Sequence, residues 1–410
     1  MNKPLEFLNN EITVKKLIKE LLSVIFYPFK YLIPKGKIIV FSGLTNYTYS
    51  GNSRYLFECL SKDKSLTVYW FTNSKIIKKY LEKFNLKHIS YASPLKLIWV
   101  LLRAKIIFND GDDYLNLFRL SDNTGTFKIS LFHGYGPKTT LAKSQNPLTL
   151  KNRINRLNKF HYINFPSPFL AKEVASQIFS LPLNKIKILG SPKNDFFFNK
   201  KFVEDAYNQK LLTKSIFGNI KNKSKLILYT PTWRPYNFNL PLLDMKSFNA
   251  PSFNEFLELH NLYFVYTVHS TWEPDNLLQN FDRIKFIDTN VNNLYDTNQM
   301  MLETDILLND YSTTSTDFSI LSRPQIFFMP DYESYTMKKG FLEDYRSTMP
   351  GSEVEDYHSF VNLLSNIMKN PTPYINKYQK KREVLLDKYY NLSNSKSVDN
   401  YKEFIKEIIK

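Results

Sequence analysis

A histidine followed by glycines and a lysine ends one predicted strand of the chain. The apolar run at 127–133 closes on His133, and Gly134, Gly136 and Lys138 come directly after it. Glycines allow backbone amides to approach a ligand closely, and the lysine supplies a positive charge that suits a phosphate. The pattern indicates an anion-binding loop, and an ordinary turn is the alternative interpretation.

A second histidine and an arginine follow two further apolar runs. His269 comes directly after the run at 263–268, and Thr232 and Arg234 come after the run at 225–230. An arginine can form two parallel hydrogen bonds with a phosphate, and the alternative is a surface arginine in a proline turn. Because two of the six histidines end predicted parallel strands, a chemical role for the pair is favoured over a structural one.

Five consecutive hydroxyl residues, 312–316, follow another short apolar run and precede a helical pattern. The series contains Ser312 and Thr313, and Asp317 comes directly after it. Free amides, hydroxyls and the positive end of a helix dipole together suit a pyrophosphate. The alternative is a cluster that only caps the helix, although capping needs one hydroxyl rather than five.

Short apolar runs alternate with helical patterns, and these runs predict the elements that position the polar residues. Buried strands are expected at 37–42, 66–71, 88–91, 104–109, 127–133, 225–230, 263–268, 284–287, 306–309 and 324–329. Helices are expected at 52–61, 74–84, 94–103, 253–260 and 378–410. Strands separated by helices of about 10–15 residues indicate βαβ units and parallel sheets.

The pattern stops and restarts, which predicts two α/β halves joined near residues 200–222. We expect an α/β fold of two Rossmann-like lobes facing a central cleft, the glycosyltransferase-B architecture, preceded by an amphipathic helix. Ligands of open α/β sheets bind beyond the carboxyl ends of the strands, so the reaction belongs in the cleft. The expected divisions are a leader at 1–36, an N-terminal lobe at 37–215, a C-terminal lobe at 216–377 and a helical segment at 378–410.

Composition excludes several classes of protein. The 410 residues are 43% hydrophobic, which excludes wholesale disorder, and a single cysteine excludes a disulfide framework and a cysteine-based zinc site. The lack of a Gly-x-Gly-x-x-Gly motif and of a Walker loop argues against a Rossmann dehydrogenase and a P-loop NTPase. The net charge of +17 favours an anionic partner, but the basic residues are spread along the chain, so nucleic acid is not expected.

The leader combines lysines with an apolar stripe. Its longest apolar stretch, 21–33, contains Pro28 and Lys30 and is shorter than the roughly 20 apolar residues that a membrane-spanning helix requires. No small-residue cleavage site follows, so a secretory signal is not expected. The leader is predicted to be either a helix packed on its own domain or a helix lying on an anionic membrane surface.

Taken in order, the motifs resemble those of the CDP-glycerol glycerophosphotransferase family, which comprises teichoic-acid primases and polymerases and related capsule enzymes. The similarity extends from about residue 37 to 360. It comprises HGYGPK (133–138), GSPKND (190–195), PTWR (231–234), a strand-end histidine at 269, NDYSTTSTDF (309–318) and MKKGFLEDYRSTMPG (337–351). The chain departs from the family pattern at Tyr135, Gly136, Lys193, Ser270 and Asn309 but keeps the reactive groups.

The resemblance implies attack of an acceptor hydroxyl on the β-phosphorus of CDP-glycerol or CDP-ribitol, with release of CMP. It makes His133 the general base, for which an imidazole pKa of about 6.5 is suitable, and gives His269 the task of stabilising or protonating the leaving phosphate. Asp317 orients the nucleotide or the alcohol. The N-terminal lobe becomes the acceptor side and the C-terminal lobe the donor side. The implied donor-binding residues are Gly134, Lys138, Lys193, Thr232, Arg234, Ser312 and Thr313.

No tightly bound cofactor is expected, because no carboxylate cluster has convincing metal-ligand spacing; dependence on Mg²⁺ stays open. The expected partners are a CDP-glycerol or CDP-ribitol donor, a lipid-linked saccharide or polyol-phosphate acceptor, and an anionic membrane surface. The expected location is peripheral, on the cytoplasmic side of the cell membrane. Two alternatives stay open: a sugar transferase of the same architecture that uses a nucleotide-sugar donor, and a basic membrane scaffold without catalysis.

Overall fold

The computed structural model of the chain describes residues 25, 32–45, 47–111, 121, 125–132, 136–139, 147–221, 223–232, 234, 240–267, 278, 281–288, 294–390 and 396–410. The expectations for His133, Gly134, His269 and nearly all of the leader therefore lie outside the described residues.

Two parallel sheets organise the described part of the chain. The first sheet has the strand order β3-β2-β1-β4-β5-β6-β7, and the second has the order β10-β9-β8-β11-β12-β13. The first sheet consists of β1 (Ile38–Ser42), β2 (Thr67–Phe71), β3 (His88–Ile89), β4 (Ala104–Asn109), β5 (Phe127–Ser130), β6 (Tyr162–Asn164) and β7 (Ile186–Lys187). The second consists of β8 (Lys225–Thr230), β9 (Leu262–Tyr266), β10 (Ile284–Phe286), β11 (Ile306–Asn309), β12 (Gln325–Phe327) and β13 (Ser352–Glu353). The expectation of two parallel α/β lobes is confirmed.

Helices cover both faces of each sheet. The first lobe has α2 (Gly51–Leu60), α3 (Lys75–Lys83), α4 (Pro94–Arg103), α6 (Pro147–Leu157), α7 (Pro168–Leu170), the π-helix η2 (Ala171–Ile178), the short η3 (Leu183–Lys185) and α8 (Pro192–Phe198). The second lobe has α9 (Lys200–Gln209), α10 (Leu211–Phe217), η4 (Pro241–Asp244), α11 (Ala250–Leu259), α12 (Thr297–Glu303), α13 (Thr314–Phe318), η6 (Ser319–Leu321), α14 (Tyr332–Lys338), α15 (Tyr345–Thr348), α16 (Tyr357–Lys369) and α17 (Pro371–Lys377).

The central strands are continuous apolar runs because both of their faces are buried, as is typical of parallel sheets. In β1, Ile39 and Phe41 face one core with α2 and α3, and Val40 faces the opposite core with α4 and η2. All three side chains are fully buried. The alternation follows from the two-residue period of a strand, and it explains why the sequence predicts these strands so well.

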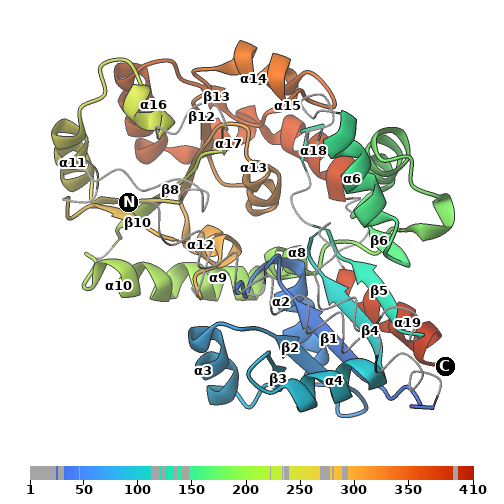
Figure 1. Cartoon of the computed structure of the whole chain (residues 1–410). Coiled ribbons are helices and arrows are strands. Elements are labelled where there is room, and N and C mark those ends of the chain that lie inside the picture. Colours follow the sequence, from blue (N-terminus) through green and yellow to red (C-terminus); the bar gives the residue numbers. More distant parts are fainter. Residues whose placement is uncertain are drawn as a thin grey trace, which may run out of the picture.

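The last two helices cross back from the second lobe to the first. Helix α18 (Gln379–Tyr390) packs between α7 of the first lobe and α13 of the second. Helix α19 (Ser397–Ile409) places Tyr401, Phe404 and Ile405 in the core of the first lobe. Figure 1 shows the red ribbon of this helix beside the strands of the first sheet. The segment at 378–410, which we expected to be helical, contains these two helices. Helix α19 packs in the core of the first lobe, and α18 contacts both lobes.

Several element boundaries differ from the expected ones. Strands β6, β7 and β13 were not expected, and the region near 200–222, expected to be a hinge, contains α9 and α10. These two helices pack on the second lobe, where Val203 and Ile216 join a core with strands β8 and β11. The change from one lobe to the other thus lies before α9, whereas the expected division at 215–216 falls inside α10. No helix in the described part of the chain is long and apolar enough to cross a bilayer.

Candidate active site

The carboxyl ends of the two sheets meet through the loops that follow β5, β8 and β11. Residues 136–139 follow β5, Thr232 follows β8, and 310–313 follow β11. The Nζ atom of Lys138 lies 3.2 Å from Oγ1 of Thr232, across the boundary between the lobes. Three of the motifs that stand far apart in the sequence therefore come together where open α/β sheets bind their ligands.

Asp310 joins the loops after β8 and β11. Its fully buried carboxylate accepts hydrogen bonds from the backbone N–H of Thr232 at 3.0 and 2.9 Å and from that of Ser312 at 3.2 Å. The N–H of Tyr311 also donates to it. A carboxylate held by several backbone donors fixes the loops that carry them, so the hydroxyls of Thr232 and Ser312 are positioned by Asp310.

Arg234 is buried, although the sequence predicted it to be a phosphate ligand. Its guanidinium makes two hydrogen bonds with Asp331, at 2.8 and 2.9 Å, and a third with Asp310 at 2.7 Å. Its side chain is 1% exposed. Burial alone lowers the pKa of Arg234, but Asp310 and Asp331 reverse this and raise the pKa above its ordinary value. In this structure the arginine holds the two acidic side chains in place and does not present its donors to a ligand.

Lys138 is the cation that the described part of this site leaves without a carboxylate partner. Its Nζ contacts the hydroxyl of Thr232, and no ion pair joins it to another described residue. Burial lowers the pKa of Lys138 to about 8, an effect that Asp310 partly offsets. A desolvated ammonium beside hydroxyl groups is suited to bind an anion that enters the junction.

The segment that carries Lys138 is attached to the second lobe. Lys138 pairs with Phe341 in an isolated antiparallel bridge, the N–H of Leu342 donates to the carbonyl of Pro137 at 2.6 Å, and the N–H of Thr139 donates to the carbonyl of Gly340 at 3.3 Å. The late motif at 337–351 therefore positions the loop after β5. The contact joins two motifs that are about 200 residues apart, since the hydroxyl of Thr139 bonds to the carbonyls of Lys339 and Gly340, 200 and 201 residues further along the chain.

Gly136 packs directly on the series of hydroxyl residues. A Cβ atom at this position would lie 2.8 Å from Cγ2 of Thr313 and 3.3 Å from Oγ1 of Thr316. Only glycine leaves room for this close approach. Oγ1 of Thr316 is buried without a hydrogen-bond partner among the described residues, and Ser312 and Thr313 remain partly exposed at the junction.

Lys193 and Asp317, both predicted to contact the donor, contact each other. Nζ of Lys193 lies 2.5 Å from Oδ2 of Asp317, and Nδ2 of Asn194 donates to Oδ1 of the same carboxylate at 2.9 Å. The hydroxyl of Tyr390, at the end of α18, also donates to Asp317. The buried carboxylate thus connects α8, α13 and α18, and the cluster joins the two lobes. Their roles in ligand binding stay predictions.

Asn52 was missed by the sequence analysis. Its side chain, fully buried, donates to the carbonyl of Phe132 at 3.1 Å and accepts from Oγ of Ser191 at 2.9 Å and from the N–H of Lys193 at 3.2 Å. Phe132 has φ of 55°, a left-handed conformation that is costly for a bulky residue. Asn52 therefore holds the residue directly before His133 and links it to the motif at 190–195. An asparagine inside a helix gives no sequence signal for this role.

No group of three or more His, Cys, Asp or Glu side chains among the described residues could hold a metal ion. The candidate site comprises Lys138, Thr232, Ser312 and Thr313 at the junction. Arg234 holds Asp310, which binds the loops of Thr232 and Ser312, and the Lys193–Asp317 pair links the lobes. The chemistry it offers is anion binding by an ammonium and hydroxyls, at the carboxyl ends of two facing sheets.

This fold and site define a two-lobed transferase with a glycosyltransferase-B-like architecture. A family model described as CDP-glycerol:poly(glycerophosphate) glycerophosphotransferase matches residues 25–407. The chain belongs to this family of phosphotransferases, as its motifs led us to expect.

Curated relatives agree with this assignment. The teichoic acid glycerol-phosphate transferase of Staphylococcus aureus is 25% identical over 408 residues, which cover 94% of this chain and 96% of the relative. The teichoic acid poly(glycerol phosphate) polymerase of Bacillus subtilis is 26% identical over 373 residues, 86% of this chain. The chain spans about half of that longer polymerase, since the match covers 47% of it.

Among solved structures, the wall teichoic acid polymerase TagF, in a variant soaked with CDPG, superposes with a TM-score of 0.72. The superposition covers 97% of this chain and 98% of the TagF chain at 20% identity. The similarity confirms the fold.

Proposed function

We propose that the protein transfers glycerol phosphate, or another polyol phosphate, from a CDP-activated donor to a hydroxyl of a lipid-linked glycan or polyol-phosphate acceptor. The observation that carries the proposal is the junction of three strand-end loops, at which the ammonium of Lys138 lies 3.2 Å from the hydroxyl of Thr232 and lacks a described carboxylate partner. The family assignment adds the donor class; one relative is named a teichoic acid glycerol-phosphate transferase and another a teichoic acid ribitol-phosphate primase.

The chemistry asked of the protein is mainly positioning and charge stabilisation, as in other phosphoryl transfers. An acceptor oxygen attacks the β-phosphorus, the bond from that phosphorus to the CMP oxygen breaks, and the acceptor proton passes to His133. Lys138 and the hydroxyls of Ser312 and Thr313 stabilise the negative charge that moves onto CMP. His269 protonates or hydrogen-bonds the departing phosphate, and the amide of Gly134 adds a further donor.

Arg234 and Asp310 act through other groups. Because Asp310 binds the N–H groups of Thr232 and Ser312, its position sets where their hydroxyls meet the donor phosphates. Arg234 in turn donates a hydrogen bond to Asp310 and fixes it. We assign the pair a positioning role and leave the direct phosphate contacts to Lys138 and the hydroxyls.

Lys193 of the first lobe and Asp317 of the second lobe contact each other. The contact, together with hydrogen bonds from Asn194 and Tyr390 to Asp317, links α8 to α13 and α18. We propose that the pair keeps the two substrates at reacting distance.

The acceptor of the proposed reaction is carried on a lipid. We therefore further propose that the protein acts at the cytoplasmic face of the membrane, with the leader lying on that surface.

A donor screen tests the proposal. The full chain is incubated with CDP-glycerol, CDP-ribitol or a UDP-sugar, with and without a soluble acceptor analogue, and the released nucleotide is identified. We expect the chain to release CMP from a CDP-polyol, and we expect the rate of release to be substantial only when the acceptor analogue is present. Release of a nucleoside diphosphate from a sugar donor would instead support the sugar-transferase alternative.

A second arm tests the base. The His133→Ala variant should bind CDP-glycerol as the natural chain does but lose about 10²–10⁴-fold in transfer rate. Unchanged turnover in this variant would remove His133 from the mechanism.

A further inference from the structure

Helix α4 exposes two large apolar side chains on one face. Leu95 is 81% exposed and Trp99 is 53% exposed. The two residues are four apart in the helix, so their side chains are neighbours on the same face. The opposite face is buried, because Leu97, Val100 and Leu101 belong to a core of the first lobe. Figure 1 shows α4 at the outer edge of this lobe, on the side away from the second lobe.

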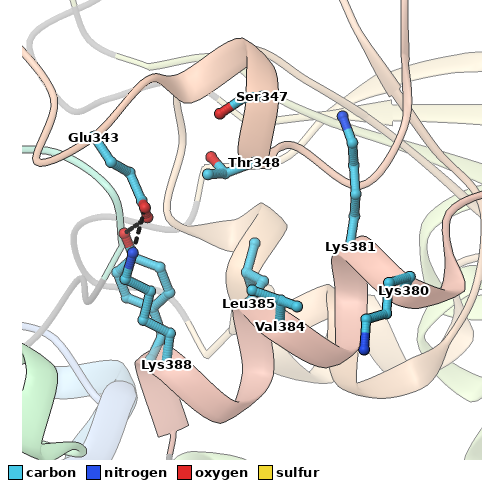
Figure 2. Close-up of a pocket in the computed structure, with 9 residues that line it drawn as sticks. Glu343, Ser347, Thr348, Lys380, Lys381, Val384, Leu385 and Lys388 are labelled. Atoms are coloured by element: carbon cyan, nitrogen blue, oxygen red, sulfur yellow. Dashed lines mark hydrogen bonds and ion pairs between the residues drawn. The ribbon is translucent and has the colours of Figure 1, made fainter.

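Among the described helices, α4 alone exposes two large apolar side chains one turn apart. Exposed apolar residues elsewhere stand singly. Leu259 directly follows the acidic Glu258 on α11, and Val384 of α18 lines a recess between α15 and α18, which Figure 2 shows. A broad partner such as a bilayer can reach a protruding helix face but not a recess. The face of α4 is therefore the described surface best shaped for such a partner.

Positive charge accompanies this face. Helix α4 contains Lys96 and Arg103 and no acidic residue. The guanidinium of Arg103 lies over the ring of Trp99, 5.2 Å from its centroid. Neither cation forms an ion pair with a carboxylate among the described residues. Exposed leucine and tryptophan side chains beside unpaired cations match the headgroup region of a membrane that contains anionic lipids.

The leader rejoins the fold at the C-terminal end of α4. The N–H of Gly36 donates to the carbonyl of Arg103 at 2.9 Å, and Nζ of Lys35 donates to the carbonyl of Leu102 at 2.7 Å. Leu32, shortly before these contacts, is 75% exposed. The segment that we propose to lie on the membrane therefore enters the first lobe directly beside the exposed face of α4.

The direction of α4 relates this face to the candidate site. The helix follows β3 and directly precedes β4, and both strands run parallel in the first sheet, so its first turn lies at the carboxyl edge and its last turn at the amino edge. Its ten residues span about 15 Å. The loop of Lys138 leaves the carboxyl edge. A membrane along α4 thus extends from the leader toward the edge at which the candidate site lies.

We propose that the outward face of α4 lies on the anionic cytoplasmic surface of the membrane, beside the leader. Leu95 and Trp99 enter the boundary between headgroups and acyl chains, and Lys96 and Arg103 contact lipid phosphates. The inference rests on the proposed function, which brings the protein to this membrane. It adds the face of the folded lobe that meets the lipid, and with it the orientation of the lobe toward a lipid-linked acceptor.

Fluorescence quenching tests the location of Trp99. The full chain and its Trp99→Phe variant are bound to vesicles of equal parts phosphatidylglycerol and phosphatidylcholine, made with ordinary or with brominated acyl chains. The difference in emission between the two proteins isolates Trp99, since phenylalanine keeps the position apolar. We expect brominated lipid to reduce this difference. A difference that is the same with both lipids would overturn the inference.

Vesicle sedimentation measures what the face contributes to binding. Leu95→Ser/Trp99→Ser should lower partition of the full chain onto the mixed vesicles about tenfold, because two apolar side chains no longer leave water. The matched control, Leu211→Ser/Leu259→Ser, replaces two helical side chains that are 65% and 81% exposed and should bind as the natural chain does. Unchanged unfolding temperatures confirm that both variants are folded.

A charge reversal tests the lipid class. Lys96→Glu should weaken binding to the mixed vesicles and leave binding to pure phosphatidylcholine vesicles unchanged, and added salt should reduce this difference. An equal effect of Lys96→Glu on both kinds of vesicle would contradict recognition of anionic lipid.

Other results would assign the face to another occupant and overturn the inference. Equal partition of the natural chain and Leu95→Ser/Trp99→Ser would do so. A concentration-dependent dimer that this variant abolishes would indicate a second copy of the chain. Protection of Trp99 from aqueous iodide in the absence of vesicles would indicate that another part of the chain covers the face.

The vesicle measurements separate this inference from the proposed reaction, because neither requires turnover. If the natural chain releases no CMP from any donor, the proposed transfer fails, and partition and quenching still decide whether α4 meets the lipid. If the chain transfers glycerol phosphate while brominated lipid leaves the emission of Trp99 unchanged, the inference about α4 fails alone.

Discussion

At the scale of single residues, three described cations of the candidate site differ in their partners. Arg234 satisfies two carboxylates in the second lobe, and Lys193 satisfies one between the lobes. Lys138 has only a hydroxyl among the described residues. Asp310 offsets only part of the cost of desolvating this ammonium, so we propose that an anionic substrate supplies the rest of the counter-charge.

The pKa of Lys138 predicts how donor binding depends on pH. Burial lowers this pKa to about 8, so the ammonium is charged below that pH and neutral above it. Affinity for CDP-glycerol should therefore fall as the pH rises through this value. Calorimetric Kd values across that range test the prediction, and Lys138→Arg, which stays charged, should flatten the profile. A profile that is the same for both proteins would exclude Lys138 as the titrating group.

Substitution of Arg234 should affect stability as well as binding. Arg234→Ala leaves the buried Asp310 and the partly exposed Asp331 without their cation, and removing one partner of a buried ion pair typically costs about 3–5 kcal/mol of unfolding free energy. As a control, Arg346→Ala removes an exposed arginine paired with Glu353 and should cost about 0–1 kcal/mol. Urea unfolding of the two variants gives the comparison, and equal losses would contradict the structural role of Arg234.

At the scale of elements, the loops depend on close packing between segments that are distant in sequence. Gly136→Ala should slow transfer, because the new Cβ would lie 2.8 Å from Cγ2 of Thr313. Thr313→Ser removes that methyl carbon and keeps the hydroxyl, so the double variant should regain activity relative to Gly136→Ala alone. Steady-state rates of CMP release test this, and a double variant no better than the single one would place the defect elsewhere.

Asn52 offers a second test at this scale. Asn52→Ala removes the donor that binds the carbonyl of Phe132, so the left-handed residue before His133 loses its support. The turnover number should fall while the Kd for CDP-glycerol stays the same. A loss of donor affinity of equal size would indicate general damage to the first lobe rather than misplacement of the loop.

Most helices and strands could be predicted from the sequence, because the pattern that reveals them lies within a few consecutive residues. The strands at 104–109 and 225–230 have the expected bounds because buried parallel strands are continuous apolar runs. Strands β7 and β13 are two residues long and too short to give a pattern.

The partners of Arg234 could not be predicted from the sequence, since Asp310 and Asp331 lie 76 and 97 residues away along the chain. Residue type identified Arg234, but only tertiary structure shows that it is already paired.

At the scale of the whole molecule, the C-terminal helices fasten the two lobes. Tyr401, at 0% exposure, and Ile405, at 2%, belong to the core of the first lobe. Asp195 binds the N–H groups of Ser397 and Val398 at 3.1 and 2.8 Å and so holds the start of α19. Deletion of residues 396–410 should therefore expose the core of the first lobe and yield an aggregated or protease-sensitive protein. A soluble, protease-resistant truncated chain would contradict this account.

In the proposed reaction, the β-phosphorus of the donor moves to the acceptor. The direct measurement uses CDP-glycerol with a radioactive label on the β-phosphorus, the full chain and a soluble acceptor analogue, with product and nucleotide separated afterwards. We predict that the label appears in the acceptor product and that unlabelled CMP is released in equal amount. Label that leaves with CDP, as in transfer of a sugar or alcohol alone, would contradict the assignment of this site to phosphoryl transfer.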